Sequence, residues 1–176
     1  MIFKIISNNG ILEKEIYSLL EMKIDQRFSF SEINNFLFII NIEENTSATF
    51  LNSDFSNIIK IQNPFSFKSI LDAIDKILSS YEYNLQSIIY APFRQELVNQ
   101  SKELILTDIH NLILINLIMY QNKIDKNLLY KKIWPKDKEI QINKLDTHLT
   151  NLKNLINKNL NYDLKFKTQK NILMID

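Results

Sequence analysis

The side chains best suited to chemistry in this sequence are amides, hydroxyls and lysines near its C-terminal end. Thr147, Thr150, Asn151, Asn154 and Lys158 recur at a spacing that places them on one face of a helix. Amides and hydroxyls donate and accept hydrogen bonds, as the edges of DNA bases do. Asparagine suits adenine, and the methyl group of threonine suits that of thymine. The pattern indicates a DNA-contacting helix, or else an ordinary helix whose polar face meets solvent.

The opposite face of this helix is apolar. Its apolar residues repeat at i, i+4, i+7 and i+11, which predicts a stripe buried against a core: Leu145, Leu149, Leu152 and Ile156. A shorter helix is expected at 128–134, ending at Pro135 with Trp134 as a core anchor. Two helices joined in this way predict a helix-turn-helix, whose second helix enters the major groove.

Lysines flank the same helix and continue towards the end of the chain. Lys144, Lys153 and Lys158 suit the DNA backbone, because lysine binds phosphate as a point charge. A further group at 165–170 fits phosphate contact and a solvated strand face equally well. The complete set of candidate DNA-binding residues is Asn143, Lys144, Thr147, Thr150, Asn151, Lys153, Asn154, Lys158, Lys167 and Lys170.

The sequence excludes several kinds of catalytic and metal site. It contains no cysteine, which rules out disulfides, thiolate zinc sites and a cysteine nucleophile. Its single glycine leaves no glycine-rich phosphate-binding loop. The two histidines, His110 and His148, have no metal-ligand partner at helical or hairpin spacing. We therefore expect no enzymatic activity, no catalytic residue, no metal and no cofactor.

Charge is distributed unevenly along the chain. The net charge is +1, yet residues 1–80 carry 7 basic and 10 acidic side chains, whereas residues 81–176 carry 14 and 10. A positive C-terminal half suits a polyanionic partner, although this excess is modest. The apolar segment 109–119 contains two asparagines and is too short to span a bilayer. Since no targeting segment is evident either, we expect a cytoplasmic protein without membrane contact.

The first 80 residues alternate apolar segments of strand length with helical patterns. Strands and helices are expected, in chain order, at 2–6, 11–22, 27–30, 36–42, 57–61 and 67–78, with Ser66 as the cap of the last helix. Residues 43–53 are polar and are expected to form a turn. The alternation predicts a small parallel α/β sheet with 36–42 as a central strand.

From residue 105 onward, short motifs resemble the winged-helix effector domain of OmpR/PhoB-type response regulators in order and spacing. Leu-Thr at 106–107 resembles the start of the family's first helix, and Leu-Leu-Tyr-Lys-Lys-Ile-Trp at 128–134 resembles its second. Leu-Asp-Thr-His-Leu-Thr-Asn-Leu-Lys at 145–153 resembles the family's DNA-contacting helix, Val-Asp-Val-His-Ile-Ser-Arg-Leu-Arg. Phe-Lys-Thr at 166–168 resembles the Ile-x-Thr that starts the family's wing.

The resemblance implies further elements and shows several departures. The residues at 86–90, 94–98 and 103–106 predict three short strands, where the family has a small antiparallel sheet, and Thr107 is a good N-cap for the first helix. The resemblance implies a loop at 135–141 that in the family can contact RNA polymerase, and a wing hairpin at 162–167 and 171–175. His110 stands in place of the family's first-helix glutamate, and Asn151 in place of its outward arginine. Because Asn-Ile-Leu-Met at 171–174 replaces the family's Gly-x-Gly-Tyr, we expect a different wing turn.

The N-terminal half resembles a shortened receiver domain of the same family. The best match, Lys-Ile-Gln-Asn-Pro-Phe at 60–65, resembles the receiver's Lys-Pro-Phe. In that alignment Asn8 and Asn9 replace the metal-binding acidic pair, Asn63 replaces the lysine, and Asn41 stands at the phosphoacceptor position. Asparagine forms no acyl phosphate and carries no charge for Mg²⁺, so the resemblance implies no phosphorylation. The same residues also fit ordinary loop asparagines.

Together these features predict a shortened receiver-like (flavodoxin-like) α/β domain at 1–80 and a winged helix-turn-helix domain at 85–176, joined by a linker at 79–84. The predicted function is that of an atypical, phosphorylation-independent OmpR/PhoB-type transcription regulator. It would bind double-stranded DNA sequence-specifically and form a homodimer through its N-terminal domain. The alternative is a protein-interaction module that docks on RNA polymerase or another regulator without specific DNA binding.

Overall fold

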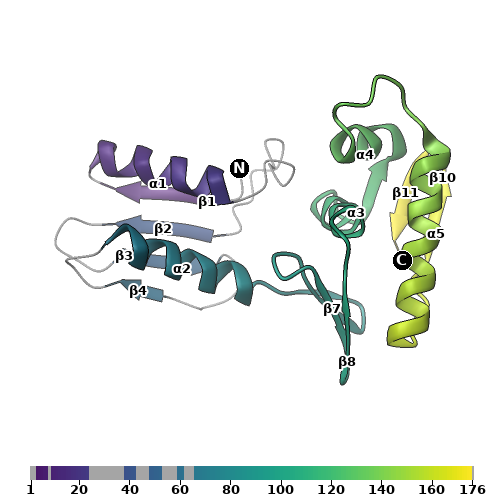
Figure 1. The fold of residues 1–176 in the computed structure, drawn as a ribbon, viewed down its shortest axis with the longest axis horizontal. Coiled ribbons are helices and arrows are strands. Elements are labelled where there is room, and N and C mark those ends of the chain that lie inside the picture. Colours follow the sequence, from purple (N-terminus) through teal and green to yellow (C-terminus); the bar gives the residue numbers. More distant parts are fainter. Residues whose placement is uncertain are drawn as a thin grey trace. The chain divides into compact units, whose positions relative to one another are not determined.

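The chain divides into two compact units, Met1–Tyr81 and Glu82–Asp176. The computed structural model describes residues 3–7, 9–23, 38–42, 48–52, 59–61 and 66–175, and the expected strand at 27–30 lies outside these ranges, as do Asn8 and Asn63. Figure 1 labels the helices and strands. In the N-terminal unit they are β1 (Phe3–Ser7), α1 (Gly10–Lys23), β2 (Phe38–Ile42), β3 (Ala48–Asn52), β4 (Ile59–Ile61) and α2 (Phe67–Ser80).

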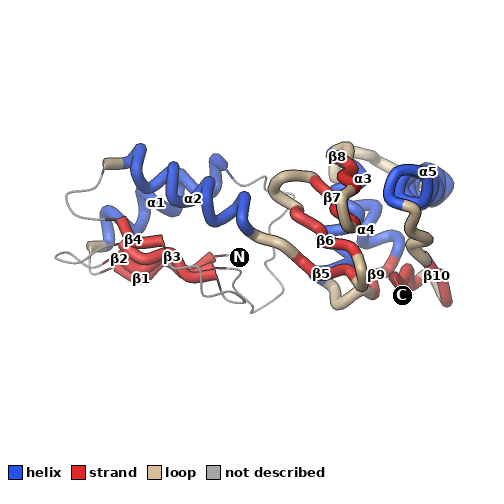
Figure 2. Tube along the Cα trace, turned by 90° about the horizontal axis from the view of Figure 1, so that it is seen from below, coloured by secondary structure: helices blue, strands red, loops and turns tan. Residues whose placement is uncertain are grey.

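The four strands that the described residues of the N-terminal unit form make one mixed sheet in the order β1-β2-β3-β4. β1 and β2 are parallel, whereas β3 is antiparallel to both of its neighbours. Both described helices lie over the same face of this sheet (Figure 2). The expectation of a parallel sheet is therefore wrong for β3, and the receiver-like class of this unit stays a prediction.

The strand β3 occupies a segment that was expected to be a turn, since polar residues predominate at 43–53. Only five residues separate the end of β2 from the start of β3. A connection this short joins antiparallel strands, because a parallel pair needs a crossover of a dozen or more residues. β3 forms because its backbone pairs with β2 and β4, and the local sequence alone does not indicate a strand there.

Side-chain oxygens define the starts of both helices in this unit. The Oδ1 atom of Asn9 accepts hydrogen bonds from the backbone of Ile11 and Leu12, at 3.1 and 3.2 Å, so Asn9 caps α1. Ser66 caps α2 in a capping box with Ser69, which confirms the expected cap. Asn41 lies within β2, opposite Ile6 and Thr49.

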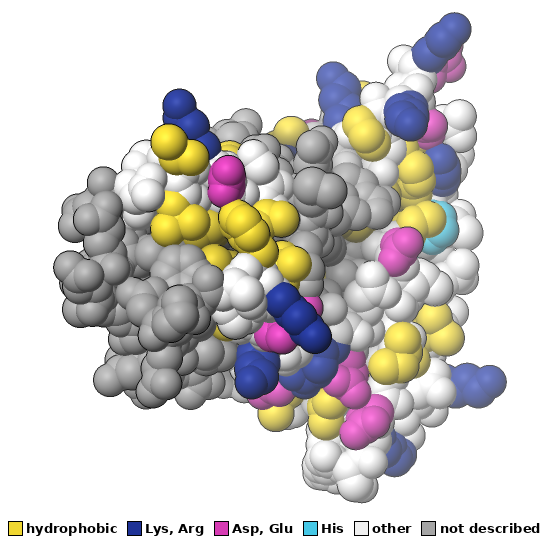
Figure 3. Space-filling model, turned by 60° about the vertical axis from the view of Figure 1, so that its left-hand side comes forward, with side chains coloured by type: hydrophobic (Ala, Val, Ile, Leu, Met, Phe, Trp, Pro, Cys, Tyr) yellow, Lys and Arg dark blue, Asp and Glu magenta, His cyan; other side chains and the backbone are white. Residues whose placement is uncertain are grey.

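The two helices of the N-terminal unit are amphipathic. Their inward side chains include Ile16, Ile70, Ala73, Ile74 and Leu78, all buried. Ile11 and Phe67, in the first turns of α1 and α2, are by contrast 73% and 49% exposed. Figure 3 shows hydrophobic side chains gathered on this unit. α2 continues to Ser80 and the next strand begins at Tyr83, so the expected linker at 79–84 is wrong in extent.

The C-terminal unit contains two small sheets and three helices among its described residues. A four-stranded antiparallel sheet in the order β5-β6-β7-β8 comes first, and a three-stranded sheet in the order β10-β11-β9 closes the chain. The elements are β5 (Tyr83–Leu85), β6 (Ile88–Ala91), β7 (Glu96–Asn99), β8 (Lys102–Ile105), α3 (Asp108–Met119), β9 (Lys123–Asp125), α4 (Lys126–Ile133), α5 (Ile142–Leu160), β10 (Phe166–Gln169) and β11 (Ile172–Ile175).

The helix α3 is the central element of this unit (Figure 1). Thr107 caps it as expected, accepting from the backbone of His110 at 3.3 Å. Eight consecutive residues, 110–117, are buried, and a helix that is apolar on nearly every side must be covered on every side. α4, α5 and β9 pack against it. The four-stranded sheet is joined to it through Asn111, whose side chain donates to the Pro92 carbonyl at 3.0 Å and accepts from the Tyr90 hydroxyl at 2.5 Å.

Several hairpin turns of this unit contain residues other than glycine whose backbone is in the left-handed conformation, with positive φ. Gln86 and Gln100 begin the two-residue turns of the first sheet, with φ of 59° and 56°. Lys170 and Asn171 both have positive φ, 48° and 66°, as a type I′ hairpin turn requires. The chain has one glycine, so these turns carry the steric cost that glycine would avoid.

The structure corrects several expected boundaries in this unit. In this unit four strands precede α3, where three were expected. The additional strand is β5, and a turn that begins at the left-handed residue Gln86 separates it from β6, the strand expected at 86–90. β9 was not expected; three residues are too few for a periodic pattern, and pairing with β11 forms the strand. The first hairpin strand spans Phe166–Gln169 in place of 162–167.

Replacing Asn111 by alanine is expected to lower the free energy of unfolding by about 0.5–1.5 kcal/mol, because the Pro92 carbonyl keeps only the backbone N–H of Gln95 as a donor and the Tyr90 hydroxyl loses the Asn111 side-chain oxygen. Asn116→Ala is the matched control: Asn116 is also buried, but its amide donates to the Leu112 carbonyl of its own helix. Urea unfolding followed by circular dichroism measures both variants. A loss for Asn116→Ala as large as that for Asn111→Ala would contradict the assigned role.

Replacing Gln100 by glycine is expected to raise the free energy of unfolding by about 0.5–1 kcal/mol, since relief of left-handed strain exceeds the extra entropy of the unfolded chain. Gln141→Gly is the control, because Gln141 has φ of −110° and carries no such strain. Thermal melts should shift upward for the first variant and not for the second. A lower melting temperature for Gln100→Gly would show that the turn is unstrained.

Candidate nucleic-acid interface

The helix α5 presents a sharp division between a buried and an exposed face. Its buried stripe is Leu145, Leu149, Leu152, Ile156 and Leu160, and it lies on α3 and α4. Six of the candidate residues lie on the other side and are exposed: Asn143, Thr147, Thr150, Asn151, Asn154 and Lys158. Figure 2 shows α5 end-on at the edge of its unit. The geometry leaves a continuous polar face open to solvent.

Hydrogen bonds within α5 divide the candidate polar groups into two kinds. The hydroxyls of Thr147 and Thr150 donate to the carbonyls of Asn143 and Asp146, at 2.8 and 2.9 Å. Their donor capacity is thus used inside the helix, which leaves a methyl group and an acceptor oxygen at each position. Asn151 and Asn154 make no such bond in the described part of the chain. Their amides can therefore offer a donor and an acceptor together to a partner.

The candidate lysines differ in whether they are already paired. Lys144 Nζ lies 2.9 Å from Asp137 Oδ2, and Lys153 Nζ lies 3.3 Å from Asp163 Oδ1. Lys158 and Lys170 are exposed and belong to no ion pair that the described residues form. Lys167 is exposed on β10. The positive charge available along α5 is therefore smaller than its lysine content suggests.

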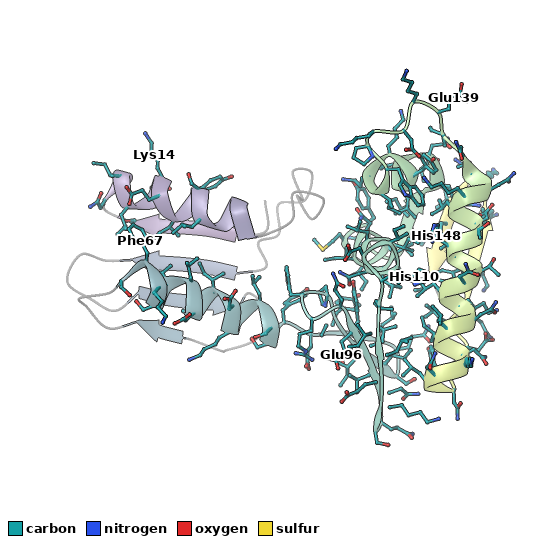
Figure 4. All side chains as sticks on the ribbon, in the orientation of Figure 1. Lys14, Phe67, Glu96, His110, Glu139 and His148 are labelled. Carbon is teal, nitrogen blue, oxygen red and sulfur yellow. The ribbon has the colours of Figure 1, made fainter. Side chains whose placement is uncertain are left out.

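The loop between α4 and α5 is held by a cluster around Asp137. The carboxylate accepts from the Tyr130 hydroxyl at 2.6 Å and from Lys144. The pKa of Asp137 is lowered, first by the hydrogen bond from Tyr130 and then by that from Lys144. Lys144 also lies 4.3 Å from the centre of the Trp134 ring, a cation–π contact. Trp134 thus serves in packing, as expected, and the exposed loop ends beyond it near Glu139 (Figure 4).

A buried ion pair fixes α5 against α4. The Lys126 side chain is 9% exposed, and its ammonium binds the carboxylate of Asp146, whose side chain is 47% exposed. Removing the aspartate would leave a buried ammonium without its counter-charge, which is costly in protein interiors. The pair was missed from sequence, because i to i+20 spacing between two helices gives no periodic signal.

A second polar junction joins the β10–β11 hairpin to the start of α4. Asp125 caps α4 through the backbone of Asn127 and Leu128, and it also accepts from the Asn171 amide at 2.8 Å. The hydrogen bond from Leu128 is the largest cause of the lowered pKa of Asp125. The Asn171 carbonyl in turn accepts from the backbone of Lys126. The turn that carries Lys170 is therefore tied to the helix pair.

The two histidines meet between α3 and α5 (Figure 4). The His110 and His148 rings lie 6.0 Å apart, edge to face, and His148 lies 5.5 Å from Trp134. His110 is buried, and its Nδ1 has no hydrogen-bond partner among the residues that the structure describes. Burial lowers the pKa of His110, with a smaller effect of His148, and burial followed by the charge of Lys144 lowers that of His148.

Other kinds of site find no support in the described part of the chain. No group of three or more metal-ligating side chains occurs within it. None of its helices is long and apolar enough to cross a membrane. Neither a model of a known protein family nor a curated protein sequence matches this chain.

His110→Phe is expected to make stability less sensitive to acid. Because the folded state lowers the pKa of this imidazole, the unfolded chain binds the proton more tightly, and the free energy of unfolding falls as pH drops below about 6.5. Urea unfolding at pH 7.5 and 5.0 measures the difference between parent and variant.

His148→Phe is the matched control and should recover less of the loss, since His148 is partly exposed. The pKa values of Asp125 and Asp137 are lowered from the ordinary 3.8, so these carboxylates change the free energy of unfolding only below the range of pH 5.0 to 7.5 used here. An equal acid-induced loss in His110→Phe and the parent would contradict the assignment.

Proposed function

We propose that this protein is a sequence-specific DNA-binding transcription regulator, an atypical relative of OmpR/PhoB-type response regulators that acts without phosphorylation. The observation that carries the proposal is the exposed face of α5, on which the unbonded amides of Asn151 and Asn154 lie opposite a fully buried leucine and isoleucine stripe. A helix anchored in this way can enter a major groove without disturbing its own core.

Each part of the interface has a distinct role in this proposal. Asn151 and Asn154 contact adenine edges, while the methyl groups of Thr147 and Thr150 contact thymine. Lys158 and the hairpin residues Lys167 and Lys170 meet backbone phosphates, which position the helix without selecting a sequence. Asn143 opens the exposed face, and Lys144 and Lys153 flank it, each held by a carboxylate.

In this proposal two copies of the protein form a homodimer through their N-terminal units. In this proposal Ile11 and Phe67, large apolar side chains that are well exposed, form part of the surface on which two chains pair. Two copies would present two α5 helices to two half-sites. With Asn41 at the position that an acceptor aspartate would need, regulation would come from protein abundance, a partner or constitutive pairing.

A second candidate function is a module that docks on RNA polymerase or another regulator. The ion pairs of Lys144 and Lys153 favour it, since they reduce the positive charge that DNA would meet. Leu155 on α5 and Ile140 in the loop before it are 36% and 39% exposed and would suit a protein surface. Under this alternative, α5 would show no preference among DNA sequences.

Asn151→Ala and Asn154→Ala are each expected to cost about 1–3 kcal/mol of discrimination at one A·T pair of a selected site. Binding to non-cognate duplex should change little, because neither side chain carries charge. The measurement is fluorescence anisotropy with the selected duplex and with single-pair variants of it. Asn159→Ala is the control, since the Asn159 amide donates to the Leu155 carbonyl of its own helix at 2.8 Å. If both variants keep the parent's preference for the selected duplex over its single-pair variants, the assignment of Asn151 and Asn154 to base contacts is wrong.

A further inference from the structure

The carboxylate of Asp163 occupies a fixed position beside α5. Asn161, with φ of 51°, reverses the chain after the helix and brings Asp163 back towards Lys153. Its neighbours hold it there: the Tyr162 hydroxyl donates to the Gln86 side chain, and Leu164 is fully buried. The ion pair is therefore set by the fold around it, although both of its partners are about half exposed.

The pair of Lys153 differs from that of Lys144. Lys144 is 2.9 Å from its carboxylate, stacks on Trp134 and shares Asp137 with Tyr130, so its ammonium is committed to the loop cluster. Lys153 has the longer contact of 3.3 Å and no aromatic neighbour among the described contacts. Half-exposed pairs of this kind contribute little to stability, so Lys153 can exchange its partner at small cost.

We propose that Asp163 competes with DNA phosphate for Lys153 and thereby lowers the affinity of this face for DNA. The inference rests on the proposed function. Phosphate contacts contribute to the binding of any sequence, whereas specific binding adds contacts to bases. A carboxylate that holds back one lysine therefore weakens binding to specific and to non-specific duplexes by about the same factor.

The test compares Asp163→Asn with the parent on a scrambled duplex and on the selected duplex, across a salt series. The full-length variant should bind both duplexes about threefold more tightly, because the freed ammonium can contact phosphate in either complex. The slope of log affinity against log salt should steepen by about 0.9, the value for one added phosphate contact. Asp72→Asn is the control, because it makes the same change of charge at an exposed residue of α2. It should change neither the affinity nor the slope against salt.

A double-mutant cycle with Lys153→Gln separates competition from simple repulsion of DNA. If Asp163 acts through Lys153, Asp163→Asn should have no effect in the Lys153→Gln background. The same gain in both backgrounds, or no gain beyond that of Asp72→Asn, would overturn the inference while leaving the proposed function in place. A parent protein that binds neither duplex would overturn both. Thermal melts of all four proteins should coincide, since the pair is half exposed.

Discussion

Burial of α3 on every side is the constraint on which the C-terminal unit depends. Residues 110–117 are buried without a break, so no single neighbour could cover the helix. α4, α5 and β9 pack on it, and the four-stranded sheet reaches it through the hydrogen bonds of Asn111 with Tyr90 and Pro92. α5 packs on α3, α4 and β8, so its apolar stripe is buried and its polar side faces outward.

The outward face of α5 is supported by contacts that lie away from it. Lys126 and Asp146 join α4 to α5 on one flank, and the Asn99 amide donates to the Leu160 carbonyl at the end of the helix. The Asp125–Asn171 junction ties the β10–β11 hairpin to the start of α4. These bonds lock the supporting elements together while leaving Asn151 and Asn154 free to bind a partner, as a surface dedicated to recognition requires.

Periodicity and capping made most of the C-terminal unit predictable. The stripe of Leu145 to Ile156 and the cap at Thr107 are local signals, and α5 and α3 begin within a residue or two of the expected positions. Strands β3 and β9 were missed because cross-strand pairing determines them. In the site, residue types indicated the polar face, and the i to i−4 bonds of the threonine hydroxyls are a local option of any helix. The carboxylates of Asp137 and Asp163 needed three-dimensional structure, since both lie in segments outside the helical periodicity.

Selection from a random duplex pool, followed by anisotropy of the full-length protein over a salt series, tests the central claim most directly. We expect an enriched motif containing A·T pairs, and an affinity that falls by about 0.9 log units per phosphate contact for each tenfold increase in salt concentration. No enriched motif together with a flat salt response would contradict it, and would favour a protein partner for the exposed face of α5.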